Sequence, residues 1–174
     1  MSVWLWIILA LVVIVGFVAF TGAPYVPSKV RDIRRAFDEL YIVSAHDVLV
    51  DLGSGDGIVL REASKRGARA VGYEIHPLLV IISRWLSRHD NRVAVRQSNF
   101  WRDRLPDDVT VVYIFGDGRD IAKMFRFVQT EATRLQCSIA VISYAFMIDE
   151  APEKTVGAHH LYTIKPLQGD ARSL

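Results

Sequence analysis

The stretch VLVDLGSGDG, residues 48–57, decides the fold, because it joins an apolar strand directly to a glycine-rich turn. Gly53, Gly55 and Gly57 alternate along the turn. Glycine has no Cβ, so it accepts left-handed backbone angles and lets a ligand approach the backbone closely. We therefore predict a strand-to-helix turn of the kind found at the first crossover of a doubly wound α/β sheet.

The residues after this turn have the spacing of an amphipathic helix. Residues 58–60 and Ala63 supply an apolar side, and Gly67 predicts where the helix ends. The opposite side is expected to face solvent and consists of Arg61, Glu62, Lys65 and Arg66.

Two acidic residues accompany the glycines. Asp51 lies two residues before the first glycine, and Glu74 ends a predicted second strand over residues 70–73. The resulting D-x-G-x-G-x-G spacing differs from the G-x-G-x-x-G of dinucleotide-binding folds. A carboxylate at the end of the second strand can accept both hydroxyls of a ribose.

This pair of motifs resembles motifs I and II of class I S-adenosylmethionine-dependent methyltransferases. The resemblance implies that the cofactor is S-adenosyl-L-methionine, that the glycine turn holds its methionine part, and that Glu74 holds its ribose. Ser54 and Asp56 in the turn either contact the cofactor or only stabilise the turn.

The rest of the chain alternates predicted strands and helices and closes with a hairpin. The predicted helices cover residues 77–89 and 117–136, the strands cover 92–96, 109–115 and 138–144, and the hairpin lies within 152–167. We predict an α/β, Rossmann-like class I methyltransferase sheet with a short C-terminal hairpin. The strand ends that carry Asp51, Glu74, Asn99 and Phe115 should then line one edge of the sheet.

The N-terminal segment has a different composition. Residues 3–20 are all apolar or glycine, and the first charged side chain is Lys29. A helix of roughly 20 residues crosses a hydrocarbon core of about 30 Å, so this segment is long enough to span a bilayer. A cleaved signal peptide is the alternative, but residues 1–6 contain no Lys or Arg. We predict one transmembrane helix within 1–22, a linker and amphipathic helix over 23–43, and the cofactor-binding domain over 44–174.

The charge and the cysteine content limit the kinds of binding partner and metal site that we expect. Lys29, Arg31, Arg34 and Arg35 follow the apolar segment, and the positive-inside rule then predicts a cytoplasmic domain. The net charge of +2 is small and scattered, so no nucleic-acid partner is predicted. Cys137 is the one cysteine of the sequence, which excludes an internal disulfide and a cysteine-based zinc site, and no metal is predicted.

Four pieces of the sequence together resemble a narrower family. They are PYVPS at 24–28, VDLGSGDG at 50–57, GYEIHPLLV at 72–80 and NFW at 99–101. In order and spacing they resemble the single-pass protein-lysine methyltransferases of bacteria and mitochondria, typified by the enzyme that methylates the c-subunit of ATP synthase. This resemblance implies a single-pass membrane protein, in a prokaryotic plasma membrane, with a lysine of another protein as the acceptor.

The resemblance also implies roles for single residues. Asn99 stands where the family has Asp and would meet the adenine, with Phe100 beside it on the cofactor. The segment that begins with Tyr25 would close over the methyl-transfer site, so Tyr25 is a catalytic candidate. Asp117, just after the fourth predicted strand, is the candidate that orients the acceptor amine.

Three positions depart from the family pattern. Ile58 replaces an Arg after the third glycine, His76 replaces an Asn, and Gly116 with Asp117 replaces an Ala-Pro pair. The last change lies near the predicted acceptor, so it bears on the acceptor more than on the cofactor.

The sequence thus favours a membrane-anchored S-adenosylmethionine-dependent N-methyltransferase that modifies a lysine of a membrane or membrane-adjacent protein. Methylation of a lipid or quinone head group is an alternative with the same anchor and cofactor. A non-catalytic, cofactor-binding membrane scaffold is a third hypothesis. A nicotinamide-dependent oxidoreductase is disfavoured by the glycine spacing.

Overall fold

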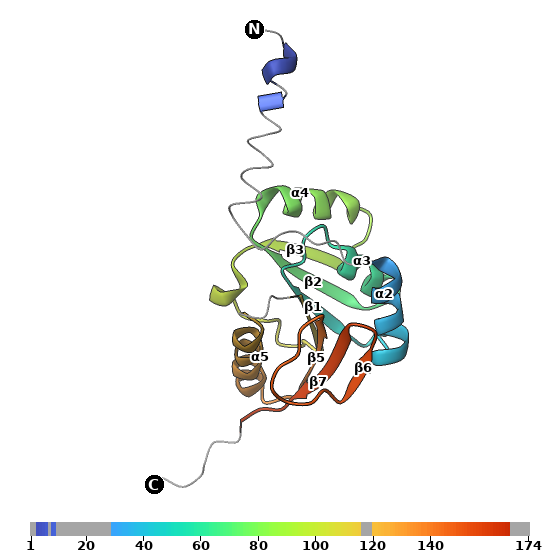
Figure 1. Ribbon diagram of the computed structural model, residues 1–174, viewed down its shortest axis with the longest axis vertical. Helices are drawn as coiled ribbons and strands as arrows, with labels where there is room; N and C mark the ends of the chain where they lie inside the picture. The colour runs from blue at the N-terminus through green and yellow to red at the C-terminus, as the bar shows by residue number, and fades with distance from the viewer. Residues whose placement is uncertain (1–2, 7, 10–28, 116–119, 168–174) are drawn as a thin grey trace.

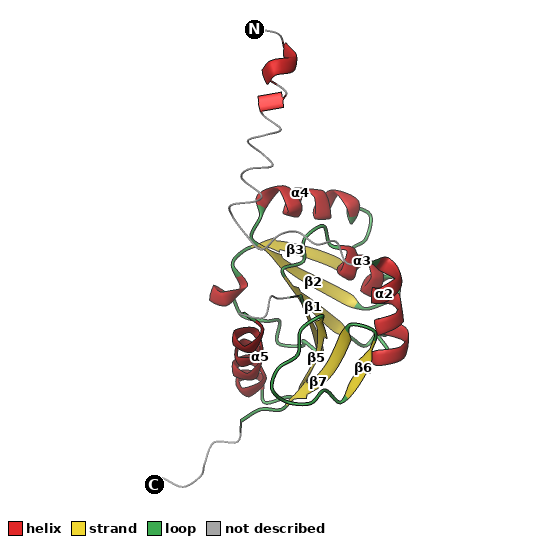
Figure 2. Cartoon of the chain, viewed as in Figure 1, coloured by secondary structure: helices red, strands yellow, loops and turns green. Residues whose placement is uncertain are grey.

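The computed structural model describes residues 3–6, 8–9, 29–115 and 120–167. The described residues form one seven-stranded sheet with helices on both faces (Figures 1 and 2). The strand order is β3-β2-β1-β4-β5-β7-β6. The pairs among β1 to β5 are parallel, and β7 pairs antiparallel with both β5 and β6. The predicted α/β sheet with a short C-terminal hairpin is confirmed.

The elements lie close to the predicted ranges. The strands are β1 (Val48–Leu52), β2 (Arg69–Glu74), β3 (Val93–Gln97), β4 (Val111–Ile114), β5 (Ile139–Tyr144), β6 (Lys154–Val156) and β7 (His159–Ile164). The helices are α2 (Val30–Arg35), which continues as the π-helical η1 (Ala36–Leu40), then α3 (Ile58–Ser64), α4 (Pro77–Leu86), the 3-10 helix η2 (Phe100–Arg102) and α5 (Ile121–Leu135). Gly67, with φ +90°, ends the α3 region as predicted, and its N–H donates to the Ser64 carbonyl over 2.8 Å.

Two apolar cores sandwich the sheet. On one face, α2, η1, α3 and α4 pack on residues such as Leu49 and Tyr113. On the other face, α5 packs on residues such as Val50 and Ile114. Because successive side chains of a strand point to opposite faces, β1 contributes to both cores and is fully buried. This burial explains why its sequence is continuously apolar apart from Asp51.

The prediction that Glu62 faces solvent is wrong. Its side chain is only 1% exposed, because α2 lies over α3 and brings Arg34 against it. Arg34 Nε donates to one carboxylate oxygen of Glu62 over 2.8 Å, and Lys65 Nζ donates to the other over 2.6 Å. Burial alone would raise the pKa of Glu62, but these hydrogen bonds hold it below its ordinary value. This ion cluster fixes the N-terminal amphipathic helix on the domain.

The N-terminal apolar run lies largely outside the described residues, which include only 3–6 and 8–9 of it. Within the described part of the chain, no helix is both long and apolar enough to cross a membrane. The transmembrane helix within 1–22 and the linker up to residue 28 therefore stay predictions.

Candidate functional site

The glycine turn after β1 lies at the carboxyl edge of the sheet and is held against β2. Gly53, Gly55 and Gly57 all have left-handed φ angles, of +88°, +53° and +77°. The N–H groups of Gly53 and Ser54 both donate to the Tyr73 carbonyl, over 2.9 and 3.0 Å. A Cβ added to Gly53 would meet no atom within 4 Å, so the turn presents open backbone to whatever lies beyond the edge.

Glu74, the last residue of β2, ties this turn to the start of α4. One carboxylate oxygen accepts the Gly55 N–H over 2.9 Å, and the other accepts the His76 N–H over 2.7 Å. The residue is 7% exposed. Because an ionised carboxylate offers about four acceptor positions, Glu74 retains capacity for two further donors. His76 occupies the N-cap position of α4 without a side-chain capping bond.

Asp51 adds a second buried carboxyl group. It lies within β1, between Gly72 of β2 and Tyr113 of β4, and is 3% exposed. Burial raises its pKa well above the usual range, and the charges of Glu74 and Asp56 raise it further. Three carboxyl groups at one sheet edge favour a ligand that brings hydrogen-bond donors or positive charge.

The side chains of Ser54 and Asp56 differ in their contacts with the turn. Asp56 Oδ1 accepts the Ile58 N–H over 3.1 Å, at the start of α3. Ser54 Oγ faces β2, where it lies 2.5 Å from a Cβ built on Gly72. Ser54 Oγ is buried there without a hydrogen-bond partner among the described residues, so only Asp56 makes a contact that stabilises the turn, and the choice between cofactor contact and turn stabilisation stays open for Ser54.

The segment after β3 brings Asn99 and Phe100 to the same edge. Asn99 Oδ1 accepts the Trp101 N–H over 3.2 Å and so caps η2. The ring centroids of Phe100 and Trp101 are 4.4 Å apart, and both rings pack toward Phe127 of α5. Trp101 therefore packs against α5, next to Asn99 in the sequence.

An aromatic cluster at the ends of β4 and β5 was not predicted from the sequence. Phe115 and Tyr144 meet edge to face with ring centroids 5.1 Å apart, and the Tyr144 ring lies 4.7 Å from the His159 ring. The Tyr113 hydroxyl and His159 Nε2 are 2.9 Å apart. Burial lowers the pKa of His159 to about 4, against the opposing charge of Asp32 on α2, so the imidazole is neutral near pH 7.

Backbone strain lies next to this cluster. Ala145, directly after β5, has φ +67°, which is rare for a residue with a Cβ. Its N–H donates to the Ala158 carbonyl over 2.7 Å, so the hairpin turn holds it in place. Strained backbone that the surrounding structure enforces is concentrated at functional sites.

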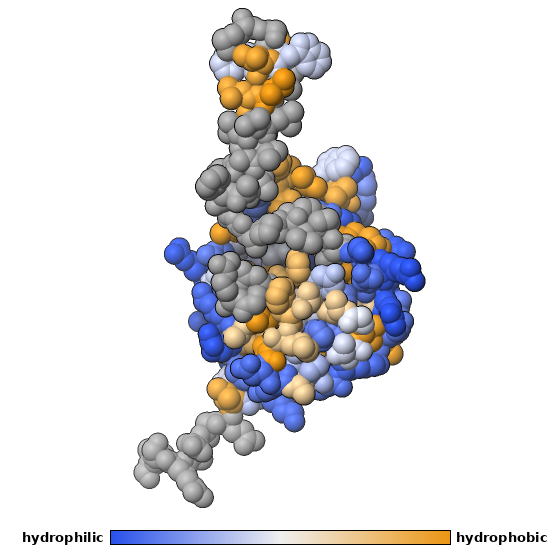
Figure 3. Space-filling view, in the orientation of Figure 1, coloured by the Kyte–Doolittle hydropathy of each residue, from blue (hydrophilic) through white to orange (hydrophobic). Residues whose placement is uncertain are grey.

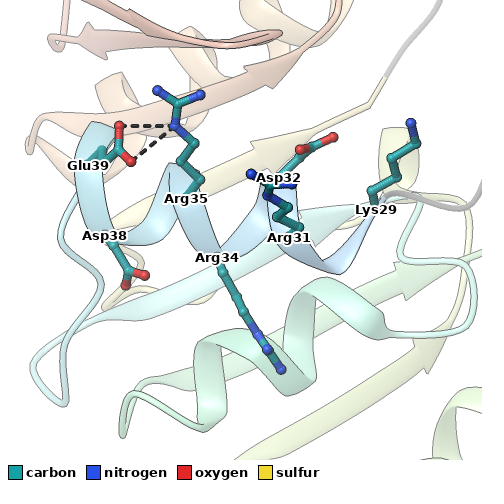
Figure 4. Close-up of a pocket in the computed structure, with 7 residues that line it drawn as sticks. All are labelled: Lys29, Arg31, Asp32, Arg34, Arg35, Asp38 and Glu39. Carbon is teal, nitrogen blue, oxygen red and sulfur yellow. Dashed lines mark hydrogen bonds and ion pairs between the residues drawn. The ribbon is translucent and has the colours of Figure 1, made fainter.

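The two catalytic candidates, Tyr25 and Asp117, lie outside the described residues, and their roles stay predictions. A shallow hollow follows α2 and η1 (Figure 4) and contains no predicted site residue. It is lined by Lys29, Arg31, Asp32, Arg34, Arg35, Asp38 and Glu39. All of them come from one helical segment, and Arg35 pairs there with Glu39 over 3.0 Å. This hollow is a solvated helix face.

The strand order, the glycine turn after β1 and the acidic residue that ends β2 define a class I methyltransferase domain. A family model described as the ANTKMT methyltransferase domain matches residues 51–155, and the chain belongs to this family.

Curated relatives bear lysine methyltransferase names. The chain is 34% identical over 128 residues to the lysine N-methyltransferase of the ATP synthase c-subunit from Xenopus laevis, covering 71% of this chain and 53% of that protein. It is 33% identical over 88 residues to the adenine nucleotide translocase lysine N-methyltransferase of Mus musculus, covering 48% of this chain and 38% of that protein. The chain thus spans about half or less of these relatives.

A solved structure supports the fold over nearly the whole domain. It is described as an RNA methyltransferase from Salinibacter ruber in complex with S-adenosyl-L-homocysteine. The TM-score is 0.71 at 29% identity, covering 86% of this chain and all of that chain.

S-adenosyl-L-methionine is the cofactor of this class, and the site fits it. Gly53 leaves open a space that a Cβ would fill, Glu74 keeps acceptor capacity for ribose hydroxyls, and the three carboxyl groups suit a ligand with a sulfonium and an ammonium.

Proposed function

We propose that this chain is a membrane-anchored protein-lysine N-methyltransferase that acts on a membrane or membrane-adjacent protein. The observation that carries the proposal is the open glycine turn joined to Glu74, inside a matched region whose relatives bear lysine methyltransferase names. The apolar run over residues 3–20 supports the anchor, and the basic residues from Lys29 to Arg35 support a cytoplasmic domain.

Different residues at the carboxyl edge of the sheet bind the cofactor in different ways. The turn at Gly53 lets the ligand approach the backbone closely. Glu74 accepts hydrogen bonds from hydroxyl groups of the ligand and also holds the turn and the start of α4 together. When bound, S-adenosylmethionine supplies a methyl group on a sulfonium for in-line transfer to a nucleophile. Because such a transfer depends on alignment, the rigidity of this edge is the chain's main contribution.

The aromatic cluster of Phe115, Tyr144 and His159 is the part of the site that we assign to the acceptor. A lysine amine, with an ordinary pKa of about 10.4, must lose its proton before it can attack. An apolar wall lowers that pKa because it disfavours the charged form. His159 is buried against the Tyr144 ring and neutral near pH 7, so it adds no repelling charge behind this wall. Aromatic faces also attract the ammonium as it enters.

One observation favours a different acceptor. The Salinibacter ruber structure, described as an RNA methyltransferase, aligns over its full length with this chain. RNA binding requires a basic surface that follows phosphates, whereas the charge of this chain is only +2 with acids and bases interspersed. The protein acceptor is therefore our first choice, and RNA is the competitor that an experiment must separate from it. Lipid or quinone head groups are tested by the same experiment.

The test incubates the full chain with cell membranes, cellular RNA and methyl-labelled S-adenosylmethionine, and then measures label in protein, RNA and lipid fractions. We expect label in protein that protease releases and ribonuclease does not. Glu74→Ala is the matched control and should reduce the label to background, because it removes the carboxylate that joins the turn to α4. Label confined to RNA or to lipid would overturn the proposal in favour of that acceptor. Tight cofactor binding without any label would favour the scaffold hypothesis.

A further inference from the structure

Helix α4 directs its large apolar side chains away from the protein. Ile81 is 63% exposed and Trp85 is 62% exposed. Together with their neighbours they form a stripe at helical spacing, which we call the α4 stripe: Leu78, Ile81, Ile82, Trp85 and Leu86. Ile75, just before the helix, is also exposed. Figure 3 shows apolar surface in this region of the molecule, where Figure 1 labels α4.

The inner side of α4 is narrow and made of smaller residues. Val80, Ser83 and Ser87 are the buried ones. A Cβ built on Gly57 would lie 2.1 Å from Ser83 Oγ, so α4 packs directly on the cofactor turn. In an ordinary surface helix the bulky apolar residues face the core, whereas in α4 they face outward.

The charged residues of α4 and of its C-terminal flank up to Arg88 all have one sign. The sequence has no Asp or Glu between Glu74 and Asp90, whereas Arg84 lies on the helix and Arg88 just after it. The Arg84 guanidinium donates to the Val95 carbonyl of β3 over 2.8 and 3.1 Å, and Arg88 is exposed. The guanidinium of Arg88 lies over the Trp85 ring, 4.9 Å from its centroid. A helix with an apolar face, a tryptophan and flanking arginines is the composition of helices that lie in the interface of an anionic bilayer.

We propose that α4 docks on the surface of an anionic lipid bilayer, with the α4 stripe among the acyl chains nearest the head groups. The positive charge of Arg88 beside Trp85, with no acidic residue on α4, argues for anionic lipid rather than for a second copy of this chain, whose own α4 would bring the same positive charge. This contact is independent of the predicted helix within 1–22 and of the proposed acceptor. It would place the membrane surface beside the helix that packs on Gly57.

The test uses the full chain with Trp85 as its one tryptophan, which requires Trp4→Phe, Trp6→Phe and Trp101→Phe. The protein is incorporated into vesicles of phosphatidylcholine and phosphatidylglycerol that contain lipids brominated near the head group. We expect Trp85 fluorescence to be quenched several-fold more strongly than in the control, and more strongly with phosphatidylglycerol than without it.

The control carries Trp85→Phe and Ile42→Trp in the same background. Ile42 is an apolar residue outside α4 that is 77% exposed, so it reports proximity that tethering alone would cause. Binding of S-adenosylhomocysteine by each variant confirms that the domain is folded. Ile81→Glu should reduce the quenching of Trp85 toward the control value.

Equal quenching of Trp85 and of the control tryptophan would overturn the proposal. If Trp85 is not quenched and becomes less exposed to water as the protein concentration rises, a second copy covers the α4 stripe instead. Absence of quenching, with Trp85 shielded equally in detergent and at any concentration, would show that another segment of the chain covers it.

Discussion

Substitution of Gly53 by alanine separates the two roles that a glycine can have in this turn. Gly53 has φ +88°, and a Cβ added there would meet nothing within 4 Å. Gly157, in the turn between β6 and β7, has φ +61° and is equally free of neighbours. The left-handed conformation costs a residue with a Cβ about 1–2 kcal/mol. Gly53→Ala and Gly157→Ala should therefore destabilise the protein to a similar degree.

The melting temperature measures that shared cost. For a domain of this size, about 1 kcal/mol corresponds to a shift of roughly 2–4 °C, so both variants should melt a few degrees lower than the wild type. Binding of S-adenosylhomocysteine should distinguish them, because the new methyl group of Gly53→Ala points to the open side of the cofactor turn. We expect a loss of affinity of at least about tenfold, or about 1.4 kcal/mol, for Gly53→Ala alone.

Calorimetric titration of both variants tests this reasoning. Wild-type affinity in Gly53→Ala would refute the assignment of the glycine turn as a close-contact surface. An equal loss of affinity in Gly157→Ala would show that destabilisation, and not the position of the methyl group, causes the effect.

Three further predictions rest on specific contacts or charges. Gly57→Ala should cost more than about 2 kcal/mol of unfolding free energy, because its Cβ would meet Ser83 Oγ at 2.1 Å, and Ser83→Ala should recover part of this cost; additive effects in a double-mutant cycle would contradict the contact. Asp51→Asn should raise the free energy of unfolding at pH 7, because the raised pKa of Asp51 means that folding disfavours its ionised form and Asn does not ionise; a denaturant titration that shows destabilisation would argue against the raised pKa. The free energy of unfolding should fall by about 3 kcal/mol in total as the pH drops from about 6.5 to about 4, because the lowered pKa of His159 means that the unfolded chain takes up the proton before the folded one. His159→Gln should flatten the pH dependence of unfolding in this window. An unchanged slope would contradict the prediction.

Local signals in the sequence were sufficient for the sheet and for the cofactor edge. The alternate glycines predicted the left-handed turn. Short, nearly continuous apolar runs indicated the central strands, and a period of 3.6 residues indicated the helices. The order of strands along the chain then placed Asp51, Glu74, Asn99 and Phe115 at one edge. Each of these inferences depends on neighbours in sequence or on a general rule of α/β topology.

Contacts between distant segments were not accessible in this way. Tyr144 and His159 face each other because β5 pairs with β7, and no local pattern encodes that register. The charge of Glu62 indicated solvent, and its burial follows only from Arg34 on another helix. The outward orientation of the α4 stripe is of the same kind, since helical spacing alone does not say which side meets the sheet.

In the proposed reaction, a lysine side chain receives the methyl group. The most direct test is amino-acid analysis of the membrane protein fraction after incubation of the full chain with methyl-labelled S-adenosylmethionine. We expect label in methylated lysine, and no such label when Glu74→Ala replaces the wild type. Label in any other residue, or equal label with Glu74→Ala, would contradict it.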